Sequence, residues 1–254
     1  MCFSIPFEPH LFGFTINIHL ILEYLAFFIG FRYYLYLRKR QDDAISTTNR
    51  LSIIIGAIFG ALFLSRLMGF LEDPILHTSE STLSIVSNKT IMGGLFGGLL
   101  GVELAKKIIG EKHSSGDLFT LPIILGIMIG KLGCFLMGIK EFTYGKTTTF
   151  LLGMNLGDNL NRHPLALYEV VFLLLLFILF KRALKKQAYP SGSIFKWFMI
   201  LYFFFRFLIE FLKPNTFLFL GLSSIQYLCI ICLLYYYKTL LNLGHYAYKK
   251  LHLL

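Results

Sequence analysis

Long apolar stretches separated by short polar segments form the dominant pattern of this chain. A helix needs about 20 mainly apolar residues to cross the hydrocarbon core of a bilayer. Seven stretches approach that length, at residues 12–37, 51–71, 90–109, 118–139, 164–181, 194–212 and 217–237. The pattern therefore predicts an all-α, polytopic membrane protein with about seven transmembrane helices.

Composition supports the membrane class. Of the 254 residues, 56% are hydrophobic, and the mean hydropathy is +0.68, which is too apolar for a soluble globular protein. The sizeable polar segments are 72–89 and 140–163, and neither resembles a separate folded domain. We expect a single integral membrane domain over residues 1–254.

The basic residues predict the orientation in the membrane. One set of connections carries fifteen of them, namely Arg38, Lys39, Arg40, Arg50, Lys106, Lys107, Lys112, Lys181, Arg182, Lys185, Lys186, Lys196, Lys238, Lys249 and Lys250. The opposite set carries five, namely Lys89, Lys140, Lys146, Arg162 and Lys213. Because basic loops stay in the cytoplasm, the N-terminus is expected outside and the C-terminus inside. The net charge of +10 is thus an orientation signal that attracts anionic lipid headgroups, and gives no reason to expect nucleic acid as a partner.

Four cations lie within the apolar stretches: Arg32, Arg66, Lys131 and Arg206. A cation at the centre of a membrane helix costs about 2.5–3.5 kcal/mol on insertion scales. Each therefore needs an acidic partner, a water-filled cavity or an anionic ligand.

Several of these cations are expected near the outer membrane surface. Arg66, Lys131 and Arg206 lie toward the outer ends of their stretches, and Arg162 precedes the fifth stretch from outside. Few acids lie at this depth, so positive charge is in excess, as a phosphate-binding site requires. The alternative is that Arg206 pairs with Glu210 or Glu169 for neutralisation alone.

Glycines recur every four residues in the third stretch, where Gly93, Gly97 and Gly101 share one face. Such spacing lets two membrane helices approach closely. The outermost pair, Gly93 and Gly94, would also expose backbone to a lipid headgroup. Further along, Glu103 needs a partner, and Lys106 or Lys107 is the nearest candidate.

The cysteines do not indicate a redox or metal site. Cys229 and Cys232 have the spacing of a redox motif, but within an apolar stretch we interpret them as core residues. Cys2 is expected to be a free thiol, and no metal or cofactor is expected.

Four motifs resemble one known family over residues 50–214. The motifs are Gly93-Gly94, Gly130-Lys131-Leu132-Gly133-Cys134-Phe135 followed by Tyr144-Gly145, Arg162-His163-Pro164-Leu165-Ala166-Leu167-Tyr168-Glu169, and Tyr202-Phe203-Phe204-Phe205-Arg206-Phe207-Leu208-Ile209-Glu210. Together they resemble the prolipoprotein diacylglyceryl transferases of bacterial inner membranes. The resemblance implies transfer of the diacylglyceryl group of phosphatidylglycerol to the lipobox cysteine of a prolipoprotein, with release of glycerol phosphate.

The resemblance also implies roles for individual residues. The expected catalytic residues are Arg206, Lys131, His163, Glu210 and Tyr202. The expected substrate-binding residues are Arg66, Gly93, Gly94, Gly133, Gly145, Arg162, Tyr168 and Glu169. Cations near the lipid phosphate would stabilise the charge that grows on the leaving group.

Three positions depart from the family pattern: Met92 replaces a histidine, Lys131 an arginine, and Cys134 an asparagine. Methionine cannot accept a proton, and lysine cannot make the bidentate phosphate contact of arginine. If a base is needed to deprotonate the attacking thiol, the candidates are His163, Glu169 and Glu210, with His163 favoured. Alternatively, the field of Arg206, Lys131 and Arg66 activates the thiol without a base.

Two other functions remain open. One is a family relative that binds anionic phospholipid or lipoprotein without catalysing transfer, or that acts on another lipid. The other is a seven-helix transporter, which is disfavoured because no pair of broken helices marks a midplane site.

Overall fold

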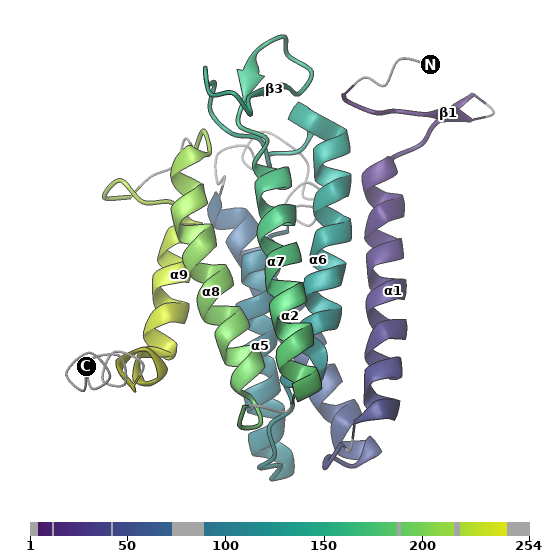
Figure 1. Cartoon of the computed structure of the whole chain (residues 1–254), viewed down its shortest axis with the longest axis vertical. Helices are drawn as coiled ribbons and strands as arrows, with labels where there is room; N and C mark the ends of the chain where they lie inside the picture. The colour runs from purple at the N-terminus through teal and green to yellow at the C-terminus, as the bar shows by residue number, and fades with distance from the viewer. Residues whose placement is uncertain are drawn as a thin grey trace. The chain divides into compact units, whose positions relative to one another are not determined.

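The computed structural model describes residues 5–11, 13–41, 43–72, 89–186, 189–215 and 219–242. Helices account for most of these residues (Figure 1). In chain order the elements are β1 (His10–Leu11), β2 (Phe14–Thr15), α1 (Ile18–Arg40), α2 (Thr47–Glu72), α5 (Ile91–Ile109), α6 (Asp117–Met137), η1 (Gly138–Lys140), β3 (Met154–Asn155), β4 (Asn161–Arg162), α7 (Leu165–Lys186), α8 (Ser193–Ile209), η2 (Glu210–Leu212) and α9 (Ser224–Tyr235).

Within the described residues, three helices are long and apolar enough to cross a membrane: α1, α2, and α6 together with η1. The helices α5 and α7 reach 19 and 22 residues, but both carry charged side chains within their length. The helices α8 and α9 have 17 and 12 residues. The structure therefore confirms the all-helical class, with three helices that are candidates to span a membrane. Each of the seven apolar stretches contains a helix.

The chain divides into two compact units, one formed by residues 1–51, 108–198 and 208–216, and the other by 52–107, 199–207 and 217–254. In the first unit, α6 lies between α1 and α7 (Figure 1). The rings of Tyr34 in α1 and Phe119 in α6 stack with centroids 4.5 Å apart. A Cβ at Gly30 would lie 3.3 Å from the Pro122 carbonyl oxygen, so α1 and α6 approach closely there.

In the second unit, α2 and α5 touch through their glycines. A Cβ added at Gly60 would lie 2.2 Å from the carbonyl oxygen of Gly97, and one added at Gly101 would lie 2.1 Å from that of Gly56. The four-residue glycine spacing therefore serves close helix packing, as the sequence predicted. The ring of Phe96 also packs against Phe203 of α8.

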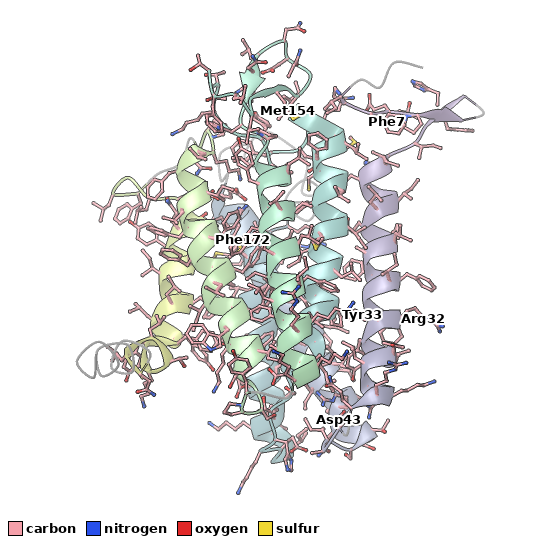
Figure 2. All side chains as sticks on the ribbon, in the orientation of Figure 1. Phe7, Arg32, Tyr33, Asp43, Met154 and Phe172 are labelled. Atoms are coloured by element: carbon pink, nitrogen blue, oxygen red, sulfur yellow. The ribbon has the colours of Figure 1, made fainter. Side chains whose placement is uncertain are left out.

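The two ends of the first unit carry different connections. Figure 2 shows Met154 at one end and Asp43, in the connection between α1 and α2, at the other. The segment 140–163 contains the antiparallel pair β3 and β4, in which Met154 faces Arg162. Sequence reasoning did not predict these strands, because each has only two residues.

Side chains cap the starts of two helices. The Asp117 carboxylate accepts hydrogen bonds from the backbone N–H groups of Gly192 and Phe195, at 2.6 and 2.9 Å. It thereby satisfies donors at the start of α8 and complements the helix dipole. Ser223 and Gln226 form a capping box at the start of α9.

Two expectations about polar and thiol groups fall on described residues. Glu103 pairs with Lys106 at 3.8 Å, which confirms the predicted partner. Cys229 and Cys232 are both 0% exposed, in agreement with core positions. Cys2, Lys249, Lys250 and most of the 72–89 segment lie outside the described residues.

Candidate functional site

The residues proposed from sequence divide between the two compact units, and each set has its own local geometry. The first unit contains Lys131, Gly133, Gly145, Arg162, His163, Tyr168, Glu169 and Glu210. The second contains Arg66, Gly93, Gly94, Tyr202 and Arg206.

Lys131 and Glu169 form a buried ion pair between α6 and α7. The ammonium of Lys131 lies 2.8 Å from Oε2 of Glu169, and the two side chains are 7% and 1% exposed. A pair this buried satisfies charges that would otherwise be very costly. Sequence reasoning placed both residues at the site but did not predict that they pair with each other.

Arg162 also has a carboxylate partner. Its Nε donates to Oδ2 of Asp158 at 2.7 Å, and its Nη1 donates to the Gly145 carbonyl oxygen at 3.4 Å. The hydrogen bond from Arg162 lowers the pKa of Asp158. The guanidinium also lies 5.1 Å from the centre of the Tyr144 ring. Arg162 thus holds the 140–163 segment together, a function that the sequence did not indicate.

Gly145 and His163 lie side by side in this segment. The Gly145 N–H donates to the His163 carbonyl oxygen at 2.9 Å, and a Cβ on Gly145 would lie 2.6 Å from the His163 Cβ. The imidazole Nδ1 of His163 lies 3.2 Å from the hydroxyl of Tyr168. The glycine therefore leaves room for a histidine whose ring is oriented by a tyrosine.

Glu210 is 1% exposed. It is the first residue of η2, the 3₁₀ turn that follows the end of α8. Its Oε1 accepts a hydrogen bond from the Asn215 side chain at 3.1 Å. Tyr202, Arg206 and Glu210 recur every four residues in the sequence. The helix ends at Ile209, so the four-residue repeat continues only through Tyr202 and Arg206.

Gly133 has a packing function that sequence reasoning missed. A Cβ at this position would lie 2.9 Å from Cδ2 of His19 in α1. His19 was absent from the expected site because no motif includes it. Only the packing of α1 on α6 brings this imidazole to Gly133.

In the second unit, Gly93 and Gly94 have different surroundings. A Cβ on Gly93 would lie 2.5 Å from the Leu64 carbonyl oxygen, whereas one on Gly94 would meet nothing closer than 3.9 Å. Gly93 is therefore required by the packing of α5 on α2. Gly94 is the member of the pair whose surroundings leave space.

Arg66 lies in α2, one residue after Ser65, which connects to the start of α5. The Ser65 hydroxyl donates to the Thr90 carbonyl oxygen at 2.9 Å. The Nη1 nitrogen of Arg66 is buried and has no hydrogen-bond partner within the described part of the chain. This nitrogen is a donor available to an anion.

Tyr202 and Arg206 lie in α8, and Tyr202 is 0% exposed. The fourth intramembrane cation, Arg32, behaves differently. It is exposed, and Figure 2 shows it on the side of α1 turned away from α6. Long cationic side chains on such a surface can extend toward the membrane interface.

The chemistry available in the first unit is that of positive and hydrogen-bonding groups close to an imidazole. Among the described residues, no group of three or more His, Cys, Asp and Glu side chains is arranged to hold a metal ion. The imidazole of His163 and the ammonium of Lys131 are groups that suit acid–base and anion-binding chemistry.

Similarity to known proteins covers most of the chain. The family model described as prolipoprotein diacylglyceryl transferase matches residues 6–241. A phosphatidylglycerol–prolipoprotein diacylglyceryl transferase from Wolbachia pipientis subsp. Culex pipiens (strain wPip) is 32% identical over 205 residues, which are 74% of this chain and 76% of that protein.

Two further relatives carry the same name. One, from Wolbachia pipientis wMel, is 32% identical over 161 residues, 58% of this chain and 59% of the relative. The other, from Geobacter sulfurreducens, is 29% identical over 188 residues, 70% of this chain and 67% of the relative. This chain spans less than two thirds of the length of some relatives. The match over residues 6–241 nonetheless shows that the chain belongs to the prolipoprotein diacylglyceryl transferase family, a family of transferases.

Proposed function

We propose that this chain transfers the diacylglyceryl group of phosphatidylglycerol to the lipobox cysteine thiol of prolipoproteins, releasing glycerol phosphate. The observation that carries the proposal is the family match over residues 6–241. The three long apolar helices support a place in the membrane. We further propose that it is a multi-pass protein of the bacterial plasma membrane with seven spans and an outer N-terminus.

Lys131 is the proposed phosphate ligand of the first unit. An ammonium has three N–H donors, so Lys131 can hold Glu169 at 2.8 Å and still donate to a phosphate oxygen. Glu169 keeps the ammonium fixed while the lipid is absent. A fixed cation stabilises the negative charge that develops as glycerol phosphate leaves.

His163 is the proposed proton acceptor. Its Nδ1 faces the Tyr168 hydroxyl at 3.2 Å, and its Nε2 makes no hydrogen bond to any described residue. An imidazole with one oriented and one available nitrogen suits deprotonation of a thiol near neutral pH. Glu169 and Glu210 are less suited, since they already bind Lys131 and Asn215.

Arg206 and Arg66 are the proposed phosphate ligands of the second unit. The buried Nη1 of Arg66 supports this assignment. Tyr202 is proposed to support Arg206, since the two residues share a face of α8. Gly94 is proposed to admit the lipid headgroup, because its surroundings leave space.

One observation favours the alternative, a relative that binds anionic lipid without transfer or that uses another lipid. Lys131 and Arg162, two of the expected outer cations, are each paired with a carboxylate. Less positive charge is therefore available for a phosphate than the sequence indicated.

The deciding experiment incubates purified protein with phosphatidylglycerol vesicles and a lipobox peptide, and follows the peptide by mass spectrometry. The proposal expects a peptide that gains one diacylglyceryl group. Arg206→Ala is expected to lower the rate about 100-fold or more, as loss of a preorganised charge donor does. Cys229→Ala, at a fully buried position, is the control and should retain the rate. An unmodified peptide, or an Arg206 variant as fast as the wild type, would refute the assignment.

A further inference from the structure

Three side chains of the first unit form a chain of contacts outside the expected site. The Cys134 thiol, in the last turn of α6, lies 3.5 Å from Nε2 of His19, at the start of α1. The other ring nitrogen, Nδ1, lies 3.2 Å from Oε1 of Glu141, which follows η1. A thiol, an imidazole and a carboxylate thus stand in the order nucleophile, base and orienting group.

The backbone around this triad fixes the position of each member. Asn17 caps α1 two residues before His19, its side chain accepting from the Leu20 N–H at 3.1 Å. Gly133 is next to Cys134, and a Cβ there would lie 2.9 Å from the imidazole. The Glu141 N–H donates to the Gly138 carbonyl oxygen at 3.3 Å. The imidazole is therefore held between its two partners by features of α1, α6 and η1.

A small recess is lined in part by Cys134. Its other walls include Thr143, Tyr144, Leu156, Leu165 and Ala166. Its volume of about 10 Å³ is that of roughly one water molecule. A larger reactant therefore reaches the sulfur only when neighbouring side chains move.

The other described cysteines are more deeply buried. Cys229 and Cys232 are both 0% exposed in α9, whereas Cys134 is 7% exposed. The Cys134 thiol lies beside an imidazole that itself contacts a carboxylate.

The geometry points to Cys134 as a second reactive centre, a nucleophile that His19 and Glu141 activate toward the carbonyl carbon of an activated acyl ester. The Cys134 sulfur forms a bond to that carbon while its proton moves to Nε2 of His19. The bond from carbon to the ester oxygen then breaks, and the departing alcohol takes the proton from His19. Glu141 holds the Nδ1–H and stabilises the imidazolium in between.

The product of this step is a thioester on Cys134. Water then attacks the thioester, with His19 again accepting a proton, and releases the carboxylic acid and the free thiol. The chain thereby turns over an ester slowly. The activity does not rest on the proposed lipid transfer, since the acyl acceptor is Cys134 and not a peptide thiol.

The test mixes the purified full chain in detergent with p-nitrophenyl acetate, an activated ester with a small acyl group. Release of p-nitrophenolate is followed by absorbance, and the acetylated residue is located by peptide mass spectrometry. We expect a burst of p-nitrophenolate and one acetyl group on Cys134. His19→Gln should lower the burst rate about 100-fold, the usual size of a general-base contribution.

Control variants separate chemistry from folding. Cys229→Ala should leave the burst unchanged, whereas Cys134→Ala should abolish it. Glu141→Gln, which keeps a polar group beside the His19 ring but removes the charge, should lower the rate while thermal unfolding stays near that of the wild type. The inference fails if Cys134 stays unmodified, or if the His19 and Glu141 variants are acetylated as fast as the wild type. The triad would then serve only to hold α1 against α6.

Discussion

Lys131 and Glu169 show how a buried charge is accommodated in an apolar chain. Their contact is 2.8 Å, and less than a tenth of either side chain is exposed. Removing one member of a buried pair leaves the other charge uncompensated, which typically costs about 3–5 kcal/mol. An exposed pair such as Lys106 and Glu103, with 14% and 50% exposure, contributes about 0–1 kcal/mol.

We therefore predict that Glu169→Gln lowers the free energy of unfolding by about 3 kcal/mol or more, because Lys131 loses its counter-charge. The measurement is thermal unfolding in detergent, followed by circular dichroism. Glu103→Gln is the matched control and should change little. Equal, small effects of the two substitutions would show that the buried pair contributes no more than a surface pair.

At the scale of elements, the close contact between α2 and α5 depends on glycines, which have no side chain. Gly97 and Gly98 are neighbours in α5, but only Gly98 has space for an added methyl group. A Cβ on Gly97 would lie 2.2 Å from the Gly60 carbonyl oxygen, whereas one on Gly98 would meet nothing closer than 3.7 Å.

Gly97→Ala is therefore expected to force the helices apart and to lower stability by about 1–3 kcal/mol, as overpacking does. Gly98→Ala should be neutral or slightly stabilising, since alanine favours the helix more than glycine. Thermal unfolding of the two variants side by side checks this difference. The prediction is wrong if the two variants unfold at the same temperature.

The connection between α1 and α2 is held by Asp43. Its carboxylate accepts hydrogen bonds from Arg50, including one from Nε at 3.0 Å, and from Arg38 at 3.2 Å. Arg50 is only 1% exposed. Burial acts to raise the pKa of Asp43, but hydrogen bonds from Arg50 and the Ile45 amide outweigh it, and the pKa falls below 3.8.

A carboxyl group with a lowered pKa stabilises the fold above its unfolded pKa and loses that effect as the pH falls. We predict that wild type is more stable than Asp43→Asn by a constant margin above about pH 5. The margin should shrink as the pH falls below 3.8, through the lowered pKa. Thermal unfolding across this range measures it, and a margin independent of pH would contradict the role of Asp43.

At the scale of the whole molecule, the asymmetry of basic residues predicts the membrane orientation. The segment 140–163 and the connection near Asp43 lie at opposite ends of the first unit (Figure 2). We predict that alkaline phosphatase fused within 140–163 is active, because that enzyme needs the outer compartment, and that a green fluorescent protein fused after residue 242 fluoresces in the cytoplasm. The reverse pattern would overturn the orientation derived from the charges.

Sequence patterns predicted some local contacts correctly. The glycine spacing predicted a close helix contact at 90–109, which the structure shows to be with α2. The spacing of charges predicted that Glu103 pairs with Lys106 or Lys107, and the structure shows the pair with Lys106. Both depend on helical periodicity, which the order of residues specifies directly. The partner of Lys131 was not predictable in this way, because Glu169 lies on another helix and either of two acids was available to the cations.

The sequence by itself therefore determined the helical class, the family and the residues able to carry charge, since apolar length, periodicity and motifs are properties of the order of residues. Only the tertiary structure decided which charges neutralise one another. It paired Lys131 with Glu169, and it brought His19 between Cys134 and Glu141, more than a hundred residues away along the chain. Such contacts arise from the packing of helices distant in sequence, and no local pattern encodes them.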